Sequence, residues 1–181
     1  MASHILNYLK IIRPNIYASN KANVLSDDNN SIFDDLISLS PVEERVIQSF
    51  DFKTHNRLSI FGFSKCAKYK KDIYQYIAKQ KVKDNLLVKT WTNGRGQALP
   101  PMKNVFDVCW LKRRSDSEKN KKIIKYWRST KDHSKFAIAE RGTVVCIGDL
   151  NRTRSQLRRG GGILCLKNND MWNYLSNMIA A

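Results

Sequence analysis

Two side chains in the segment 131–136 have the types and the spacing that phosphodiester chemistry requires. His133 and Lys135 are two residues apart, so both project from one face if the segment enters a β-strand. An imidazole can attack phosphorus or carry a proton, and an adjacent ammonium can neutralise charge on phosphate oxygens. Asp132 would point to the other face, so we do not assign it as the group that orients His133. Taken alone the triplet is a weak signal, because most such triplets are surface residues.

A loop rich in arginine and glycine follows, between two apolar segments. Residues 148–162 include four arginines, an asparagine, a glutamine and three consecutive glycines. Guanidinium groups suit phosphate oxygens, and glycines let a backbone approach a ligand closely. A mobile basic hairpin loop is the simpler alternative, but glycines beside arginines favour a phosphate-contacting loop. Its candidate contacts are Arg152, Arg154, Arg158 and Arg159.

The elements that must position these residues can be predicted from composition and periodicity. Strands are expected at 57–63, 86–91, 105–110, 135–139, 143–147 and 162–166. Helices are expected at 31–39, at 66–80 and from about Asp170 onward, and loops or turns at 26–30, 93–94 and 141–142. Strands mixed with helices predict an α/β domain, with α+β as the alternative, in which helices flank a mixed β-sheet.

The charge of the chain is strongly basic and unevenly distributed. Lysine and arginine total 32 against 16 acidic residues, a formal net charge of +16. Residues 1–60 hold 6 basic and 7 acidic residues, whereas residues 61–181 hold 26 and 9. This imbalance favours a polyanionic partner. Nucleic acid is favoured over an anionic membrane, because no basic amphipathic helix stands out.

Composition also limits the classes of protein to which this chain can belong. An apolar content of 42% and a charged content of 27% are those of a globular protein. We find no apolar stretch long enough to span a bilayer and no secretory signal pattern at the start, which leaves the compartment open. Four cysteines do not make a disulfide scaffold at this length, and no cysteine–histidine cluster suggests a metal. We therefore expect no metal, no other cofactor and no membrane contact.

Several ordered motifs along the chain resemble the deoxyribonuclease II family. The C-terminal signature is carried by Asp132-His-Ser-Lys-Phe136, Val145-Cys-Ile-Gly-Asp-Leu-Asn-Arg152 and Arg159-Gly-Gly-Gly-Ile-Leu-Cys165. Earlier matching segments are 11–17, 63–74 and 85–94. The resemblance runs from about Leu6 to the end and is loosest over the loop-rich residues 20–54. Residues 1–181 are therefore expected to form a single lobe of the family's fold.

That family is similar to the phospholipase D superfamily, and the resemblance implies a particular chemistry. Two histidine–x–lysine (HxK) motifs, from two related lobes, meet at a pseudo-twofold axis. One histidine attacks the phosphodiester to give a phosphohistidine, and the other protonates the leaving 5′ oxygen. Products then carry 3′-phosphate ends, no metal is needed and the working pH is acidic. By this resemblance His133 and Lys135 are the second HxK motif, Asn151 is a phosphate-positioning amide, and Cys146 and Cys165 occupy the positions of a family disulfide.

The chain also departs from the family pattern. It carries one HxK motif, and neither His4 nor His55 lies in another, the segment 55–57 being the nearest substitute. Phe136 and Ala137 stand where the family usually has tryptophan and cysteine. The family is normally secreted or lysosomal, although no signal peptide is seen. A complete site then needs a second copy of this chain or a separate chain that supplies the first lobe, and a symmetric homodimer is the simpler solution.

Two functions from different classes fit these observations. The first is a deoxyribonuclease II-like endonuclease that cleaves DNA without a metal and shares its active site between two chains. The second is a non-catalytic nucleic-acid-binding or assembly subunit, in a ribonucleoprotein or viral particle, descended from the nuclease. A structural subunit has no physical need for His133, Lys135, Asn151 and the arginine-glycine loop together. Their combination favours the first function.

Overall fold

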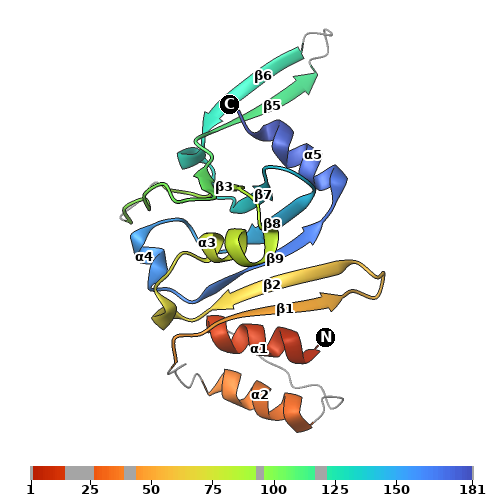
Figure 1. Cartoon of the computed structure of the whole chain (residues 1–181), viewed down its shortest axis with the longest axis vertical. Helices are drawn as coiled ribbons and strands as arrows, with labels where there is room; N and C mark the ends of the chain where they lie inside the picture. The colour runs from red at the N-terminus through yellow and green to blue at the C-terminus, as the bar shows by residue number, and fades with distance from the viewer. Residues whose placement is uncertain (1, 15–26, 39–43, 93–95, 117–121, 181) are drawn as a thin grey trace.

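The structure, a computed structural model, describes residues 2–14, 27–38, 44–92, 96–116 and 122–180. Its main feature is a seven-stranded sheet in the order β1-β2-β9-β8-β7-β3-β4 (Figure 1). β3 and β4 are parallel, and the other neighbouring pairs are antiparallel, so the sheet is mixed. The strands are β1 Ile47–Lys53, β2 Ser59–Lys65, β3 Leu86–Lys89, β4 Val105–Asp107, β7 Phe136–Ala139, β8 Val144–Gly148 and β9 Gly161–Lys167.

Helices flank this sheet, which confirms the expected mixed α/β fold. The helices are α1 Ala2–Ile12, α2 Asp27–Ile37, α3 Ile73–Ile77, α4 Arg154–Leu157 and α5 Asn169–Met178. Short turns of other helical types are η1 Ala67–Tyr69, η2 Ala78–Val82 and η3 Ser129–Lys131. None of the helices in the described part of the chain is long and apolar enough to cross a membrane.

Two apolar cores cover the two faces of the sheet. Along β7, Ala137 and Ala139 pack in the core that contains α3, whereas Phe136 and Ile138 pack in the core that contains α5. Because β7 is buried on both faces, its sequence is a continuous apolar run rather than an alternating one. α1 packs beside β1, β2 and β9, at the other end of the sheet from β3 and β4 (Figure 1).

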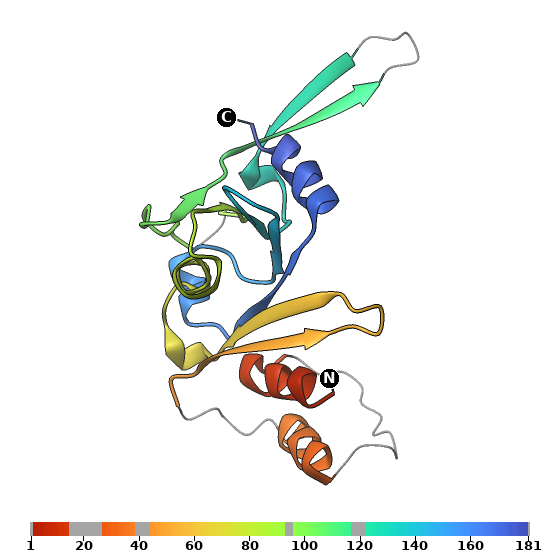
Figure 2. The ribbon, with the colours of Figure 1, turned by 45° about the vertical axis from the view of Figure 1, so that its right-hand side comes forward.

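A two-stranded antiparallel ribbon extends from the body of the molecule. It is formed by β5 Trp110–Asp116 and β6 Lys122–Arg128 (Figures 1 and 2). Figure 2 shows the ribbon pointing away from the main sheet beyond the end of α5. β6 then leads through η3 directly into the segment that holds His133.

The structure corrects several expected helix boundaries. The single helix expected at 66–80 is interrupted, because Lys70 adopts a left-handed φ of 53° after η1. Asp72 then begins a new helix by accepting a hydrogen bond from the Tyr74 backbone N–H over 3.0 Å. Residues 27–30, expected as part of a loop, belong to α2.

The expected strands are mostly present with shifted ends. The strand expected at 105–110 ends at Asp107, and Trp110 already belongs to the ribbon. Gly142, with φ of 93°, lies in the expected turn between β7 and β8. The turn expected at 93–94 lies outside the described residues. α1, β1 and the ribbon were not expected from the sequence.

Candidate active site

His133 and Lys135 lie in the extended segment that leads into β7. The strand begins at Phe136, so both residues precede it. The His133 side chain is exposed, and its ring stacks on Trp91 with 4.2 Å between ring centroids. The Lys135 ammonium turns back and donates to the carbonyl oxygen of His133 over 2.7 Å. An accessible imidazole and an ammonium are therefore held on one short segment.

A buried lysine fixes the backbone of this segment. Lys89, at the end of β3, is 0% exposed. Its ammonium donates to the carbonyl oxygens of Asp132 and Ser134 and to the Asp132 carboxylate. Asp132 also accepts hydrogen bonds from the Ser134 backbone N–H and from the Trp127 indole, over 2.7 Å and 3.3 Å. The chain on both sides of His133 is thereby tied to the interior of the sheet.

Electrostatics at this anchor favour an ionised Asp132. Burial would raise the pKa of Asp132, but hydrogen bonds from Ser134 and Lys89 outweigh that effect and bring the pKa to about 2. Desolvation lowers the pKa of Lys89, and its ion pair with Asp132 opposes the shift. Lys89 and Asp132 thus each have hydrogen-bond partners inside the protein, as a buried ion pair requires.

Asn151 contacts Trp91, the residue on which the His133 ring stacks. The side-chain oxygen of Asn151 accepts a hydrogen bond from the Trp91 backbone N–H over 3.0 Å. The Trp91 indole donates to the carbonyl oxygen of Thr130 over 2.9 Å, and its ring lies against His133. The hydrogen bond to Trp91 uses the amide oxygen. The amide nitrogen of Asn151 is the atom that could donate to a phosphate.

An open hollow of about 650 Å³ lies beside His133. Polar residues of the HxK segment and of the end of β8 line it together with apolar residues of α5, among them Lys135, Asp149, Tyr174 and Met178. Desolvation raises the pKa of Asp149, although a hydrogen bond from the Gly162 backbone N–H and the charges of Arg159 and Lys135 oppose this shift. The hollow thus joins an imidazole, an ammonium and a carboxyl group whose proton is held more tightly than usual.

Arg152 has a position that disagrees with its expected role. Its side chain is 0% exposed and forms ion pairs with Asp72, over 2.8 Å, and with Asp107. It also donates to the carbonyl oxygen of Pro100 over 3.2 Å. A guanidinium enclosed by two carboxylates in the interior is unsuited to contact a phosphate in solution. Arg152 therefore joins β4, the start of α3 and the loop after β8, and we remove it from the candidate phosphate contacts.

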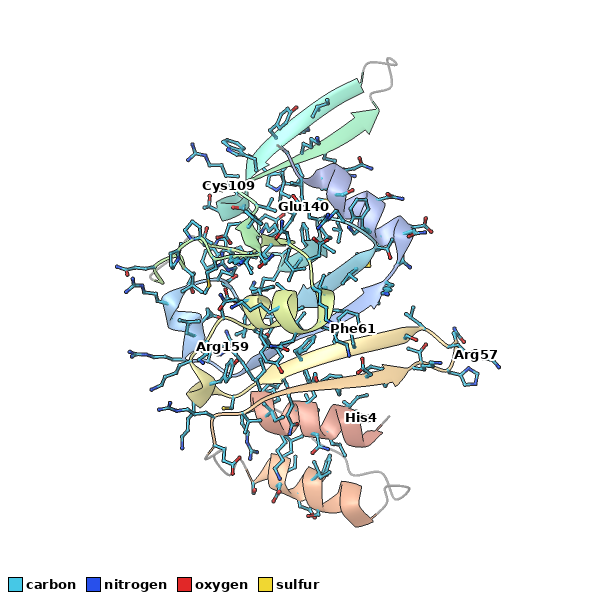
Figure 3. The ribbon with its side chains drawn as sticks, in the orientation of Figure 1. His4, Arg57, Phe61, Cys109, Glu140 and Arg159 are labelled. Atoms are coloured by element: carbon cyan, nitrogen blue, oxygen red, sulfur yellow. A yellow bond between two sulfur atoms is a disulfide. The ribbon has the colours of Figure 1, made fainter. Side chains whose placement is uncertain are left out.

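The other three arginines of the loop point to solvent. Arg154, Arg158 and Arg159 are exposed, and Arg159 lies at the end of the loop near α4 (Figure 3). Lys65 fixes the loop from inside the protein, because its buried ammonium donates to the carbonyl oxygens of Gln156, Leu157 and Arg159. It is therefore an anchored platform with exposed guanidinium groups.

Two of the three glycines of this loop, Gly160 and Gly162, allow close packing inside the protein. A side chain at Gly160 would meet the carbonyl oxygen of Ile12 at 2.4 Å, and one at Gly162 would meet the Tyr8 hydroxyl at 2.3 Å. These contacts bring α1 directly against the start of β9. At Gly160 and Gly162 the close approach of the backbone is thus made toward α1.

Cys146 and Cys165 are joined by a disulfide. They are direct partners on β8 and β9, with 4.0 Å between their Cα atoms. The bridge lies within the core that contains α3, and Cys146 precedes the last residue of β8, Gly148, by two positions. It covalently closes the loop that presents the arginines.

The other two histidines lie away from this hollow. His4 is on α1, and Figure 3 shows it at the end of the molecule opposite the ribbon. His55 is exposed in the turn between β1 and β2, whose tip carries Arg57 (Figure 3). Among the described residues, no group of histidine, cysteine and carboxylate side chains could hold a metal ion.

Lys89, Trp91 and Asp149 were missed as functional candidates by reasoning from the sequence. A lysine that ends an apolar strand is a detectable signal, because a charged group at an inward position needs buried partners. The contact of Trp91 with His133 depends on how β3 and the segment before β7 meet in space. No local pattern in the sequence carries that information.

Comparison with known proteins places these features in a family. The family model described as Deoxyribonuclease II matches residues 1–181. The chain is 30% identical over 168 residues to Deoxyribonuclease-2 of Caenorhabditis elegans, which covers 91% of this chain and 43% of the relative. It is 30% identical over 130 residues to Cell-death-related nuclease 7 of the same organism, covering 70% and 34%.

A mammalian relative gives the same result. The chain is 36% identical over 115 residues to Deoxyribonuclease-2-beta of Mus musculus, covering 61% of this chain and 31% of the relative. In each of these three comparisons the chain spans less than half the length of the relative.

Proposed function

This chain belongs to the deoxyribonuclease II family, and from that premise we propose that it is an endonuclease that hydrolyses DNA with a metal-independent histidine mechanism. Residues 1–181 act as one lobe, and a second chain completes the active site. One observation carries the proposal. His133 is exposed at an open hollow while its backbone is fixed by buried Lys89 and its ring rests on Trp91. An accessible nucleophile on an immobile support is what preorganised catalysis requires.

His133, Lys135 and Asn151 have distinct roles in the proposed reaction. The His133 imidazole attacks phosphorus, the bond from phosphorus to the 5′ oxygen breaks, and a second histidine protonates that oxygen. Water then hydrolyses the phosphohistidine and leaves a 3′-phosphate end. The Lys135 ammonium, and the amide nitrogen of Asn151, stabilise the charge on the non-bridging oxygens.

The second histidine comes from a second copy of this chain. Beside the hollow, Ile147 and Leu164, which are direct partners on β8 and β9, are 45% and 40% exposed. Tyr174 on α5, which also lines the hollow, is 64% exposed. Apolar side chains grouped beside a catalytic motif favour an isologous interface, which would bring two copies of His133 together.

The test is plasmid cleavage by the purified protein in EDTA at mildly acidic pH. His133→Ala should abolish cleavage without changing folding or DNA binding, because an exposed imidazole contributes little to the core. Lys135→Ala should lower the rate by a factor of about 100 to 1,000, the usual effect of removing a charge-stabilising group. His55→Ala is the matched control and should keep full activity. Absence of cleavage by a verified dimer would refute the proposal that this protein is a nuclease.

The alternative function is a nucleic-acid-binding subunit without catalysis. The contact that favours it is the hydrogen bond from Lys135 to the carbonyl oxygen of His133, because an ammonium engaged by its own backbone must turn outward before it can meet a phosphate. If the EDTA assay shows DNA binding and no cleavage, this function replaces the first.

A further inference from the structure

We propose that the β5–β6 ribbon is an arm that binds duplex DNA outside the catalytic hollow. Binding by this arm does not require catalysis, whereas its presentation of DNA to His133 rests on the proposed function. The ribbon has no part in the site described above. Its charge, its exposed side chains and its attachment to the body lead to the proposal.

The first argument is charge. The strands β5 and β6 together contain six basic residues and one acidic residue. Among the ribbon side chains that the structure describes, those of Lys112, Arg113, Lys125 and Arg128 are cationic and none is acidic. A projecting basic ribbon of this kind complements a phosphate backbone.

The second argument is the composition of one ribbon face. In the antiparallel register Trp110 is opposite Arg128, and Lys112 is opposite Tyr126, so these four side chains share a face. The Arg128 guanidinium lies 5.2 Å from the centre of the Trp110 ring, and Tyr126 is 60% exposed. Cations and aromatic rings thus alternate on a surface that faces solvent.

The third argument is that the ribbon is firmly attached. On its other face Leu111 is 0% exposed and packs with Trp127 in the core that contains α5. The Ala180 backbone N–H donates to the carbonyl oxygen of Trp110 over 3.1 Å. A ribbon fixed at its base loses little entropy when it binds, so its contacts contribute directly to affinity.

The fourth argument is the connection between the arm and the hollow. The Trp127 indole donates to the Asp132 carboxylate over 3.3 Å, and Asp132 anchors the backbone beside His133. The arm and the HxK segment are therefore one continuous, bonded structure. Duplex DNA is the favoured ligand because a two-stranded ribbon fits the major groove, about 12 Å wide, and seven-residue strands extend about 23 Å.

The experiment measures binding of a fluorescently labelled duplex of about 20 base pairs, two helical turns, in EDTA. All variants carry His133→Ala so that cleavage does not consume the probe. The arm variant is Lys112→Ala with Arg128→Ala, the two cations of the face described above, and the matched control is Lys53→Ala with Lys79→Ala, two exposed lysines elsewhere that remove the same charge. Unchanged thermal unfolding verifies that each variant folds.

The arm variant should bind about tenfold more weakly, and the slope of log affinity against log salt should fall by about 1.8, for two lost phosphate contacts. The control should leave both unchanged. Equal losses in arm and control variants would overturn the proposal, since they would reflect net charge alone. Loss of affinity only for single-stranded DNA of the same length would also overturn it. If the arm variant loses binding but the active protein cleaves nothing, the arm stands and the proposed function fails.

Discussion

At the scale of single residues, buried cations fix the backbone, and the His133 side chain stays exposed. Lys89, Lys65 and Arg152 are all buried. Lys89 bonds to the backbone beside His133, Lys65 bonds to the arginine loop, and Arg152, within that loop, bonds to Asp72. Each of these cations must be fully bonded to offset its desolvation. The result is a rigid backbone around His133, whose own side chain stays in solvent.

Asn151 provides a residue-scale test that separates two roles. Asn151→Asp keeps the side-chain oxygen that accepts from Trp91 but replaces the amide nitrogen by a second carboxylate oxygen. If the amide donates to phosphate, cleavage should fall by a factor of about 100, because a carboxylate would repel the substrate. Thermal unfolding should stay close to that of the unmodified protein. Near-normal activity would show that Asn151 only holds Trp91.

Asp132 predicts how stability depends on acid. Its folded pKa of about 2 lies below an unfolded value of about 3.9, so its stabilisation is present above pH of about 4 and is lost as pH falls toward 2. Because the group is partly exposed, we expect about 1 kcal/mol after screening. Urea unfolding between these pH values should be less acid-sensitive in Asp132→Asn. If the free energy of unfolding depended on pH identically in the unmodified protein and in Asp132→Asn, Asp132 would not stabilise the fold as we propose.

At the scale of elements, the sequence predicts where the strands lie better than it predicts which residues come into contact after folding. β7, β8 and β9 follow from apolar runs and turn signals, and the disulfide positions follow from the family resemblance. The β5–β6 ribbon was missed because residues 111–125 are too charged to suggest a strand. The burial of Arg152 could not be predicted, since Asp72 and Asp107 are distant in sequence and meet it only after folding.

The arginine loop gives a prediction at this scale. Replacing Arg154, Arg158 and Arg159 together by alanine should weaken DNA binding and lower the salt slope by about 0.9 for each lost phosphate contact. Arg152→Ala should instead destabilise the fold by about 3–5 kcal/mol, because it leaves two carboxylates without their partner. Fluorescence anisotropy over a salt series and urea unfolding separate the two effects. A triple variant with an unchanged salt slope would remove the loop from the DNA-binding surface.

At the scale of the whole molecule, the proposed reaction needs a second histidine in addition to His133. One HxK motif can supply a nucleophile or a proton donor, and hydrolysis by the proposed route needs both. The exposed Ile147, Leu164 and Tyr174 lie beside the hollow, so a partner that covers them would also close the hollow. In the proposed dimer, the arginine loop and the ribbon would add basic surface around the shared site, which suits a long polyanionic substrate.

Mixing active and inactive subunits tests this shared site most directly. Unmodified protein and His133→Ala are combined in different proportions, allowed to exchange subunits, and assayed on plasmid DNA in EDTA at mildly acidic pH. If each site needs His133 from both copies, activity follows the square of the unmodified fraction, and an equal mixture keeps about one quarter of the activity. Activity that falls in direct proportion to the unmodified fraction, leaving about one half, would show that each chain works alone. That result would contradict the shared active site.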